Sequence, residues 1–475
     1  MKESETRRSA LEKSRFLLNE AVKGDAEMKR RDFLRATAAG ALAAPFLPNL
    51  LTAAKGAETS VEPVARWYKG NLHAHSQWSD GQDLPEVALA EYKKRGYNFF
   101  AFTEHNTLQR NDFRFDGKDA KPFDGETSYW KRLATKGVRS NLTEDRVRKA
   151  RELFGEDSVV LKETAEGTFV RLKTCDELRQ QFGDKENFLL MSAFEMTTPW
   201  SHLNLINVDE NFYLGDEKIG GVISKSYDKA REMYDGTGEP WLFMVNHPLW
   251  QYYNAQPSDL IARPEVKFFE FTNNCTSHPF IPGAWTPETF WDAVNAYRVS
   301  HDQNLLYGTG TDDSHGVYNT SFVAFYGWTG VRAKELTPKA ILDAMNRGDS
   351  YVSTGLELED VNFDGKTLSV KAKPEKEGKW RVEFFGTKKD YDPTPKYFEA
   401  QAGPKIDRRI EGYSEKIGEK LATFDGIEGS YTLKSDDLYV RARVTRVDAE
   451  PVYLGTGADK SPLPTDGAWT QPYRG

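Results

Sequence analysis

Histidines and carboxylates recur along the sequence at spacings that suit metal coordination. Six of the eight histidines lie where apolar runs end: His73 and His75 in NLHAHSQWSDG, His105 in FFAFTEHN, His202 in FEMTTPWSH, His247 in FMVNHP and His315 in GTGTDDSH. Asp80, Glu195 and Asp313 stand in or beside the same segments. Imidazole and carboxylate groups together suit zinc, manganese or iron(II). One histidine so placed is more often a packed or exposed residue, but six of them favour a shared metal site.

The spacing within two of these motifs adds a geometric argument. In an extended segment His73 and His75 project from the same face, so both imidazoles can reach one ion. Asp313 and His315 repeat that spacing in a second segment. Asp312 precedes Asp313 directly, and Asp313 is predicted as the ligand because it gives the D-x-H register.

The segments that must position these side chains alternate between short apolar runs and helix signals. The apolar runs predict strands at 99–103, 188–193, 203–208, 241–245, 268–271, 305–307 and 322–326. Prolines predict helix starts at Pro85, Pro287 and Pro338. Buried strands that alternate with helices predict a parallel α/β layout like a barrel. Strand ends share one rim in such a fold, so the motifs would converge there.

The rest of the chain divides into an insertion and a C-terminal part. Residues 107–187 form a long charged insertion, with a helix predicted around 144–154. Helix signals then become scarce, and alternating segments predict strands at 367–372, 380–385 and 438–444. We therefore predict a metal-binding α/β domain at 64–355, followed by a small antiparallel β domain, like a β-sandwich, at 356–475.

Residues 28–57 resemble a twin-arginine export signal. Arg30 and Arg31 precede an apolar stretch of small residues over 36–51, which is the order of segments that such a signal needs. The resemblance implies that the chain uses the twin-arginine export machinery and works in the periplasm or elsewhere outside the cytoplasm.

Two alternatives concern this N-terminal region. The first is a transmembrane anchor, but the apolar run is shorter than the roughly 20 residues of a span and is interrupted by Pro45 and Pro48. We therefore expect no permanent membrane span after signal cleavage. The second concerns residues 1–27, which are polar and unpatterned. Either they form an N-terminal extension, or the start codon is assigned too far upstream and Met28 is the true initiator.

The composition excludes several classes of function. A net charge of -8 and a pI near 5.7 argue against a nucleic-acid binder, because there is no general excess of cations to displace condensed counterions. The two cysteines, Cys175 and Cys275, do not form a CxxC pair, so a thiolate zinc site is not expected. Any metal must use nitrogen and oxygen ligands.

Taken together, the motifs resemble the polymerase and histidinol phosphatase (PHP) superfamily of metal-dependent hydrolases. The HxH followed by SDG, the TEHN in place of the usual TDH, the Glu of FEM, the NHP and the DxH stand in the family's order over roughly residues 68–355. The resemblance implies a distorted (β/α)7 barrel with a site for two or three divalent ions.

The resemblance also implies a ligand set for each ion. The first ion would be held by His73, His75, Glu195 and Asp313. The second would share Glu195 and add His202 and His247, and the third would take Asp80, His105 and His315. Glu195, Asp80 and His247 are also predicted to be catalytic.

Such a site predicts phosphoester hydrolysis. Three divalent ions would bring about six positive charges against three negative charges from Asp80, Glu195 and Asp313, which leaves about +3 to attract a phosphate. The expected reaction is attack on phosphorus by a hydroxide that bridges the ions, with Asp80 or His247 assisting proton transfer. The expected partner is a small, phosphorylated ester.

Two other functions remain open from the sequence. A carboxylic or carbamic ester hydrolase could use Trp200 and Trp250 to wall an aromatic substrate, although core packing is the commoner role of such residues. A periplasmic binding protein stabilised by metal could instead recognise a ligand through its β domain. The only support for that function is a scatter of aromatic residues expected to be exposed, such as Tyr391, Tyr397, Tyr413 and Trp469, and scattered aromatics are common.

Overall fold

The computed structural model describes residues 64–475 apart from the segments 111–119, 123–128, 135–141, 215–218, 250–254, 274–285, 319–323, 375–376, 399–409, 450–451, 454–461 and 464–465. The predicted export signal, its alternatives and Trp250 lie outside these described residues. Contacts group Glu62–Gly475 as one unit. Among the helices of the described ranges, none is long and apolar enough to cross a membrane.

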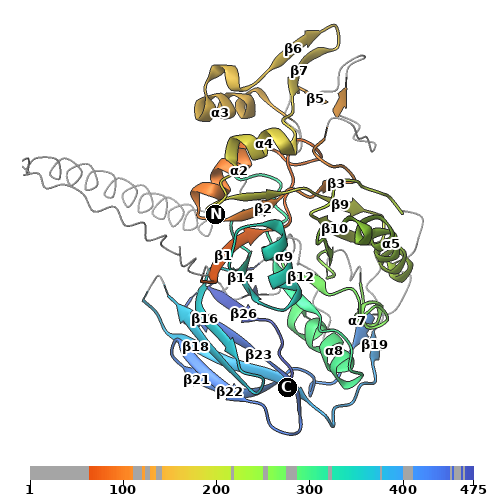
Figure 1. Ribbon diagram of the computed structural model, residues 1–475, viewed down its shortest axis with the longest axis vertical. Helices are drawn as coiled ribbons and strands as arrows, with labels where there is room; N and C mark the ends of the chain where they lie inside the picture. The colour runs from red at the N-terminus through yellow and green to blue at the C-terminus, as the bar shows by residue number, and fades with distance from the viewer. Residues whose placement is uncertain are drawn as a thin grey trace, which may run out of the picture. The chain divides into compact units, whose positions relative to one another are not determined.

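A nine-stranded mixed sheet runs in the order β21-β18-β23-β26-β15-β14-β1-β2-β8 (Figure 1). Its strands are β1 (Arg66–Asn71), β2 (Phe99–Ala101), β8 (Leu189–Met191), β14 (Trp328–Ala333), β15 (Ser350–Ser353), β18 (Trp380–Lys388), β21 (Glu419–Asp425), β23 (Asp437–Arg446) and β26 (Gly467–Thr470). Strands β1, β2 and β8 pair in parallel. The other neighbours are antiparallel.

A six-stranded sheet carries most of the predicted ligands, in the order β13-β12-β11-β10-β9-β3. Its strands are β3 (Glu104–His105), β9 (Ala193–Thr197), β10 (His202–Ile206), β11 (Leu242–Val245), β12 (Phe268–Thr272) and β13 (Tyr307–Gly310). Strand β10 is antiparallel to both β9 and β11, so the prediction of a parallel layout is wrong there. Only residues 198–201 join β9 to β10, which is too short for a parallel crossover and permits only a hairpin.

The two sheets do not close into one barrel of paired strands among the described residues. They are joined because β2 leads into β3 and β8 leads into β9. At the other edge of the six-stranded sheet, the backbone of β13 forms hydrogen bonds with side chains in place of a paired strand. Thr329 Oγ1 accepts from the N–H of Gly310 at 3.0 Å and donates to its carbonyl at 2.9 Å. The Gln471 side chain similarly bonds the N–H and carbonyl of Gly308 at 2.9 and 2.8 Å. These side chains satisfy the edge that a closed (β/α)7 barrel would pair.

Helices flank the two sheets where prolines and capping residues predict them. They are α2 (Pro85–Lys94), α3 (Glu144–Phe154), α4 (Cys175–Phe182), α5 (Ile219–Tyr234), α7 (Pro257–Ile261), α8 (Pro287–Ser300) and α9 (Pro338–Asn346). The predicted helix starts at Pro85, Pro287 and Pro338 are confirmed. The strand predicted at 322–326 is wrong over 324–326, which form a turn, and the strand begins at Trp328.

The insertion is more ordered than its charged sequence indicates. Besides the predicted helix α3, it contains the four-stranded antiparallel sheet β4-β5-β7-β6. The strands are β4 (Ala120–Pro122), β5 (Tyr129–Arg132), β6 (Leu161–Thr164) and β7 (Gly167–Arg171). Lys131 Nζ donates to the carbonyl of Ser79 at 3.0 Å, and Arg146 donates to the carbonyl of Gln82 at 2.6 Å. The insertion thus holds the loop that carries Asp80.

The C-terminal part is built of antiparallel strands, as predicted. A second sheet, β16 (Glu357–Phe363), β17 (Thr367–Lys373) and β22 (Glu428–Thr432), shares a hydrophobic core with β18 and β23. Two-stranded sheets are formed by β19 (Lys396–Phe398) with β20 (Ile410–Gly412) and by β24 (Val452–Tyr453) with β25 (Pro462–Leu463). Strand β26 pairs with both β15 and β23, so one sheet runs across residue 355.

A buried ion pair ties β23 to α8. The guanidinium of Arg441 donates to both carboxylate oxygens of Asp292, at 2.8 and 2.6 Å. Arg441 is 1% exposed and Asp292 is 2% exposed. Glu288 lies 2.9 Å from the same guanidinium. A paired, bidentate arginine of this kind is costly to leave without its partner.

Candidate metal centre

Eight of the nine predicted metal ligands meet in three groups whose donor atoms lie within 4.8 Å of one another. The groups are His73, His75 and Glu195; Glu195, His202 and His247; and His75, Asp80, His105 and His315. The ninth, Asp313, lies beside the first group, with its Oδ1 3.1 Å from His75 Nε2 and 3.3 Å from His73 Nε2. These groups match the three sets implied by the sequence, except that His75 also belongs to the third.

Strand pairing explains why residues distant in sequence come together. Parallel pairing of β3 with β9 sets His105 opposite Glu195. The β9–β10 hairpin sets His202 opposite Thr197. The chain therefore turns back on itself, which lets Glu195 and His202 belong to one group despite the short stretch of sequence between them. A parallel bridge between Ala74 and Ser314 holds the HxH and DxH motifs side by side.

Glu195 is the carboxylate that two groups share, and it is fully buried. Its Oε1 lies 3.2 Å from His202 Nδ1, 3.3 Å from His73 Nε2 and 3.7 Å from His247 Nε2. Its Oε2 lies 2.6 Å from His105 Nδ1. Oε1 thus faces members of both groups that share Glu195, whereas Oε2 faces His105 of the third group.

The third group is the most open part of the cluster. Asp80 Oδ1 lies 3.3 Å from Nε2 of both His105 and His315. This oxygen is buried and makes no hydrogen bond of good geometry. The Asp80 side chain as a whole is 47% exposed and that of His105 is 26% exposed, against 0% for His73. Donor atoms that converge without bonding one another fit a cation between them.

The loop before Asp80 is held by Glu104, the acidic residue of TEHN. This buried carboxylate accepts from the Ser76 N–H at 3.0 Å, the Ser79 hydroxyl at 2.5 Å and the Gln109 amide at 3.0 Å. A Cβ at Gly81 would lie 2.4 Å from the His75 carbonyl, so the turn requires glycine. Glu104 belongs to none of the three groups, and it supports the loop instead.

The adjacent aspartates have different tasks. Asp312 accepts from the backbone N–H groups of Phe325, Tyr326 and Gly327 at 2.8 to 2.9 Å, and so holds a loop. Burial raises the pKa of Asp312 to about 6, although these hydrogen bonds oppose the shift. Asp313 has a positive φ of 47° and turns its side chain to the cluster. The D-x-H register therefore selects the aspartate that faces the histidines.

The carboxylates favour protonation of two imidazoles of the cluster, His73 and His105. Burial lowers the pKa of His73, but Asp313, Glu270 and Glu195 outweigh burial and raise it well above the ordinary value. Burial likewise lowers the pKa of His105, and Glu195 and nearby Asp80 reverse that effect and raise it.

Three other members of the cluster, His75, Asp80 and Asp313, have lowered pKa values. Burial lowers the pKa of His75, and the neighbouring His105 and His315 lower it further, to about 3. Burial raises the pKa of Asp80, but its close contacts with the imidazoles of His105 and His315 outweigh burial and hold the pKa well below its usual range. The pKa of Asp313 is also lowered, because His73 and other imidazoles outweigh its burial. Protons therefore occupy positions that a divalent ion would take.

These shifts predict that the stability of the metal-free protein depends more strongly on pH than that of the metal-loaded protein. Raised pKa values of His73 and His105 stabilise the metal-free fold fully below the unfolded value of 6.5, and this contribution is lost as pH rises through the folded values. Bound ions would replace those protons. Raising the pH from 6 to 9 is therefore expected to lower the melting temperature of the metal-free protein more than that of the Mn²⁺-loaded protein, as measured by differential scanning fluorimetry. Equal changes in both forms would contradict this coupling.

One carboxylate in contact with the cluster was missed by the sequence analysis. Glu270, in the middle of β12, is 1% exposed, and its Oε1 lies 2.5 Å from His73 Nδ1. The signal was a single charge within the apolar run FFEFT, which reads as an ordinary buried strand. Asn246 of the NHP motif was also missed, and its amide donates to Glu195 Oε1 at 2.7 Å.

Comparisons with known proteins do not assign a function to this site. No family model and no curated protein matches the chain. Among solved structures, a two-domain protein from Bacteroides vulgatus that contains a predicted PHP-like metal-dependent phosphoesterase aligns over 78% of this chain and 96% of its own, at 15% identity and a TM-score of 0.37. A likeness at that TM-score does not decide the fold or the function of this chain.

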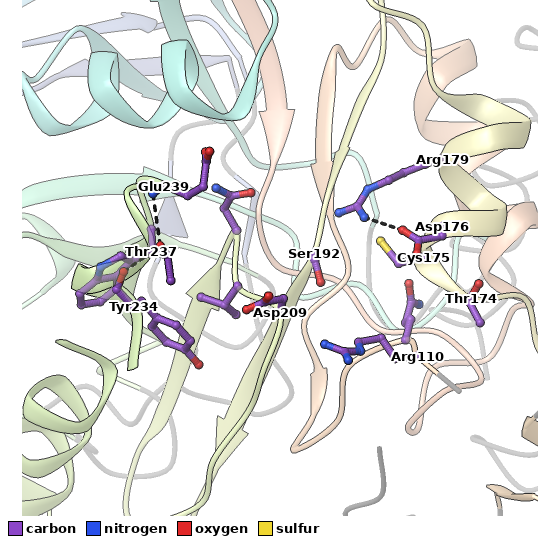
Figure 2. Close-up of a pocket in the computed structure, with 14 residues that line it drawn as sticks. Arg110, Thr174, Cys175, Asp176, Arg179, Ser192, Asp209, Tyr234, Thr237 and Glu239 are labelled. Atoms are coloured by element: carbon purple, nitrogen blue, oxygen red, sulfur yellow. Dashed lines mark hydrogen bonds and ion pairs between the residues drawn. The ribbon is translucent and has the colours of Figure 1, made fainter. Parts of the chain in front are cut away.

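A separate pocket of about 600 Å³ contains none of the predicted ligands. Figure 2 shows Arg110 and Arg179 on one side of it and Tyr234 and Glu239 on the other. Its wall includes the first turn of α4, where the N–H of Cys175 donates to the Gln109 carbonyl at 2.8 Å and the N–H of Glu177 donates to the Thr174 side chain. The clustered histidines, and not this pocket, therefore define the candidate active site.

Proposed function

We propose that this chain is a metal-dependent hydrolase that acts on phosphoesters. The observation that carries the proposal is the convergence of six imidazoles with Glu195, Asp80 and Asp313 into adjoining groups of donor atoms. A structural metal site needs about four closed ligands, whereas this cluster has more donors and an open side. Two or three divalent ions, of zinc, manganese or iron, fit this donor set.

The charge balance favours a substrate that carries negative charge. Three divalent ions would bring about six positive charges, and Glu270 adds a fourth carboxylate to Asp80, Glu195 and Asp313. The surplus is then about +2 with neutral histidines, one less than the predicted ligands alone indicate. This surplus still favours a phosphate and the charge that develops on it in the transition state.

Exposure indicates how a substrate reaches the cluster and which residues move protons. Asp80 and His105 form the exposed side, whereas the His247 side chain is only 2% exposed. Asp80 stays ionised because its pKa is lowered, which favours ligation over donation of a proton. Buried His247 is likewise placed to ligate. When bound, the ions would supply electrophilic stabilisation of the phosphoryl oxygens and lower the pKa of an attacking water.

Substrate selectivity with defined metals tests the proposal. The protein is stripped with a chelator, reloaded separately with Zn²⁺, Mn²⁺ or Fe²⁺, and assayed on p-nitrophenyl phosphate, bis-p-nitrophenyl phosphate and p-nitrophenyl acetate. Hydrolysis of a phosphate ester that depends on added metal is the expected result. Metal-dependent hydrolysis of the acetate alone would establish the carboxylic ester alternative. Metal binding without any hydrolysis would favour the binding-protein alternative.

Neither of the two described tryptophans adds support to these alternatives, although Tyr397 of the β domain is half-exposed. Trp200, the predicted wall for an aromatic substrate, packs against the hydrophobic core around β9 to β12. Trp469, an aromatic residue that supported ligand recognition by the β domain, is fully buried in the same core.

The location and partners of the protein are part of the same proposal. The pattern around Arg30 and Arg31 supports export by the twin-arginine machinery to the periplasm or beyond. A small phosphorylated ester is the proposed substrate, and the acidic composition disfavours nucleic acid.

A further inference from the structure

We infer that Glu270 is a positioning residue that sets the orientation and tautomer of His73 and aligns the segments carrying His247 and Asp313. This inference rests on the proposed metal-dependent function and deepens it. Both carboxylate oxygens of Glu270 already have hydrogen-bonding partners, so the proposed role is distinct from ligation.

The first step concerns how Glu270 is tolerated in the core. Its strand β12 is buried along its whole length, and neighbouring Phe269 and Phe271 belong to the main hydrophobic cluster. A buried carboxylate is costly unless its oxygens are bonded. Here Oε1 lies 2.5 Å from both His73 Nδ1 and Thr311 Oγ1. Oε2 accepts from the His247 N–H and the Asn273 amide, each at 2.7 Å. Four partners thus fill both oxygens.

The second step concerns the imidazole of His73. When Nδ1–H donates to Glu270, the lone pair of Nε2 is left to face the cluster. Nε2 indeed lies 3.3 Å from Glu195 and 3.3 Å from Asp313. A carboxylate on the far nitrogen of a ligating histidine holds the ring and increases its basicity. Glu270 therefore presents His73 to an ion in the tautomer that can bind it.

The third step concerns the backbone on either side. His247 has a positive φ of 23°, a backbone conformation that residues other than glycine rarely adopt. Its N–H is held by Glu270, which stabilises this conformation. Thr311, also bound to Glu270, lies two residues before Asp313 in the strand end that follows β13. One carboxylate thus connects the ends of β1, β11 and β13, each of which carries a predicted ligand.

The test measures metal affinity in Glu270→Gln and in a matched control, Asp292→Asn. Asp292 is also a buried, hydrogen-bonded carboxylate, but it lies on α8 and pairs with Arg441. Mn²⁺ and Zn²⁺ dissociation constants are measured by competition with a chromogenic chelator, and metal content by elemental analysis. Glu270→Gln is expected to weaken the binding of one ion by about 10- to 100-fold. Asp292→Asn is expected to leave metal affinity unchanged, and the same affinity in both variants would overturn the inference.

A double-mutant cycle separates action through His73 from general damage. The effect of Glu270→Gln on metal affinity should largely disappear in a His73→Ala background, because the positioned ring is absent. An undiminished effect in that background would overturn the inference. Wild-type protein that binds no ion would defeat the proposed function itself, whereas normal binding by wild type and Glu270→Gln would defeat only the inference.

The wild-type protein supplies an independent readout if Glu270→Gln does not fold. Nitrogen chemical shifts of the His73 ring in Zn²⁺-loaded, ¹⁵N-labelled protein report which nitrogen carries the proton. A protonated Nδ1 with a metal-bound Nε2 is expected. Metal on Nδ1 would overturn the assignment.

Discussion

Glu195→Gln is expected to lower metal-dependent phosphoester hydrolysis by on the order of 10³-fold, which is about 4 kcal/mol of transition-state stabilisation. Glu195 contributes to two groups of donor atoms, so its loss weakens two predicted ion sites. Glutamine keeps the size of the side chain but removes the negative charge that faces several imidazoles. The measurements are kcat/KM on a phosphate ester and metal content per chain.

Glu383→Gln is the matched control for this experiment. Glu383 is also a largely buried carboxylate, but it lies on β18 and pairs with Arg443 and Lys420, away from the predicted ligands. It should retain normal metal content and kcat/KM. A Glu195→Gln protein with full activity and full metal content would show that the cluster does not carry the reaction.

Asp292→Ala is expected to lower the free energy of unfolding by about 3 kcal/mol, the largest loss of stability among the substitutions considered. The change leaves the buried guanidinium of Arg441 without its bidentate partner, although Glu288 remains nearby. Urea unfolding followed by tryptophan fluorescence, with saturating metal in every sample, measures the effect. Asp343→Ala removes an exposed pair with Lys339 and should leave the midpoint almost unchanged. Similar midpoints for the two variants would contradict this account.

The site was more predictable than the fold that carries it. Ligand motifs are local, because a histidine at the end of an apolar run can be recognised within a few residues, as at His105 and His247. The three sets of neighbours were implied by the resemblance to the PHP superfamily and not by the residues alone. Glu270 could not be identified in this way, because its importance depends on His73 and Thr311, which are distant in sequence.

Long-range pairing limited the prediction of architecture. Apolar runs and capped helices located elements such as α2, α8 and β12. Nothing in a strand's own residues reveals that β10 is antiparallel to its neighbours or that β26 joins β15. The open edge at β13 is equally hidden, because its partners are single side chains from other segments.

The bonds between Gln471 and Gly308 have a consequence for the order in which the protein matures. Gly308 lies on the strand leading to Asp313, yet the amide that completes its edge comes after every predicted ligand in the sequence. A chain emerging from the ribosome therefore presents all its histidines before that edge is sealed. Full assembly of the candidate metal centre is therefore expected to follow synthesis of the C-terminal sheet, and any metal binding would then depend on translation of a segment that supplies no predicted ligand.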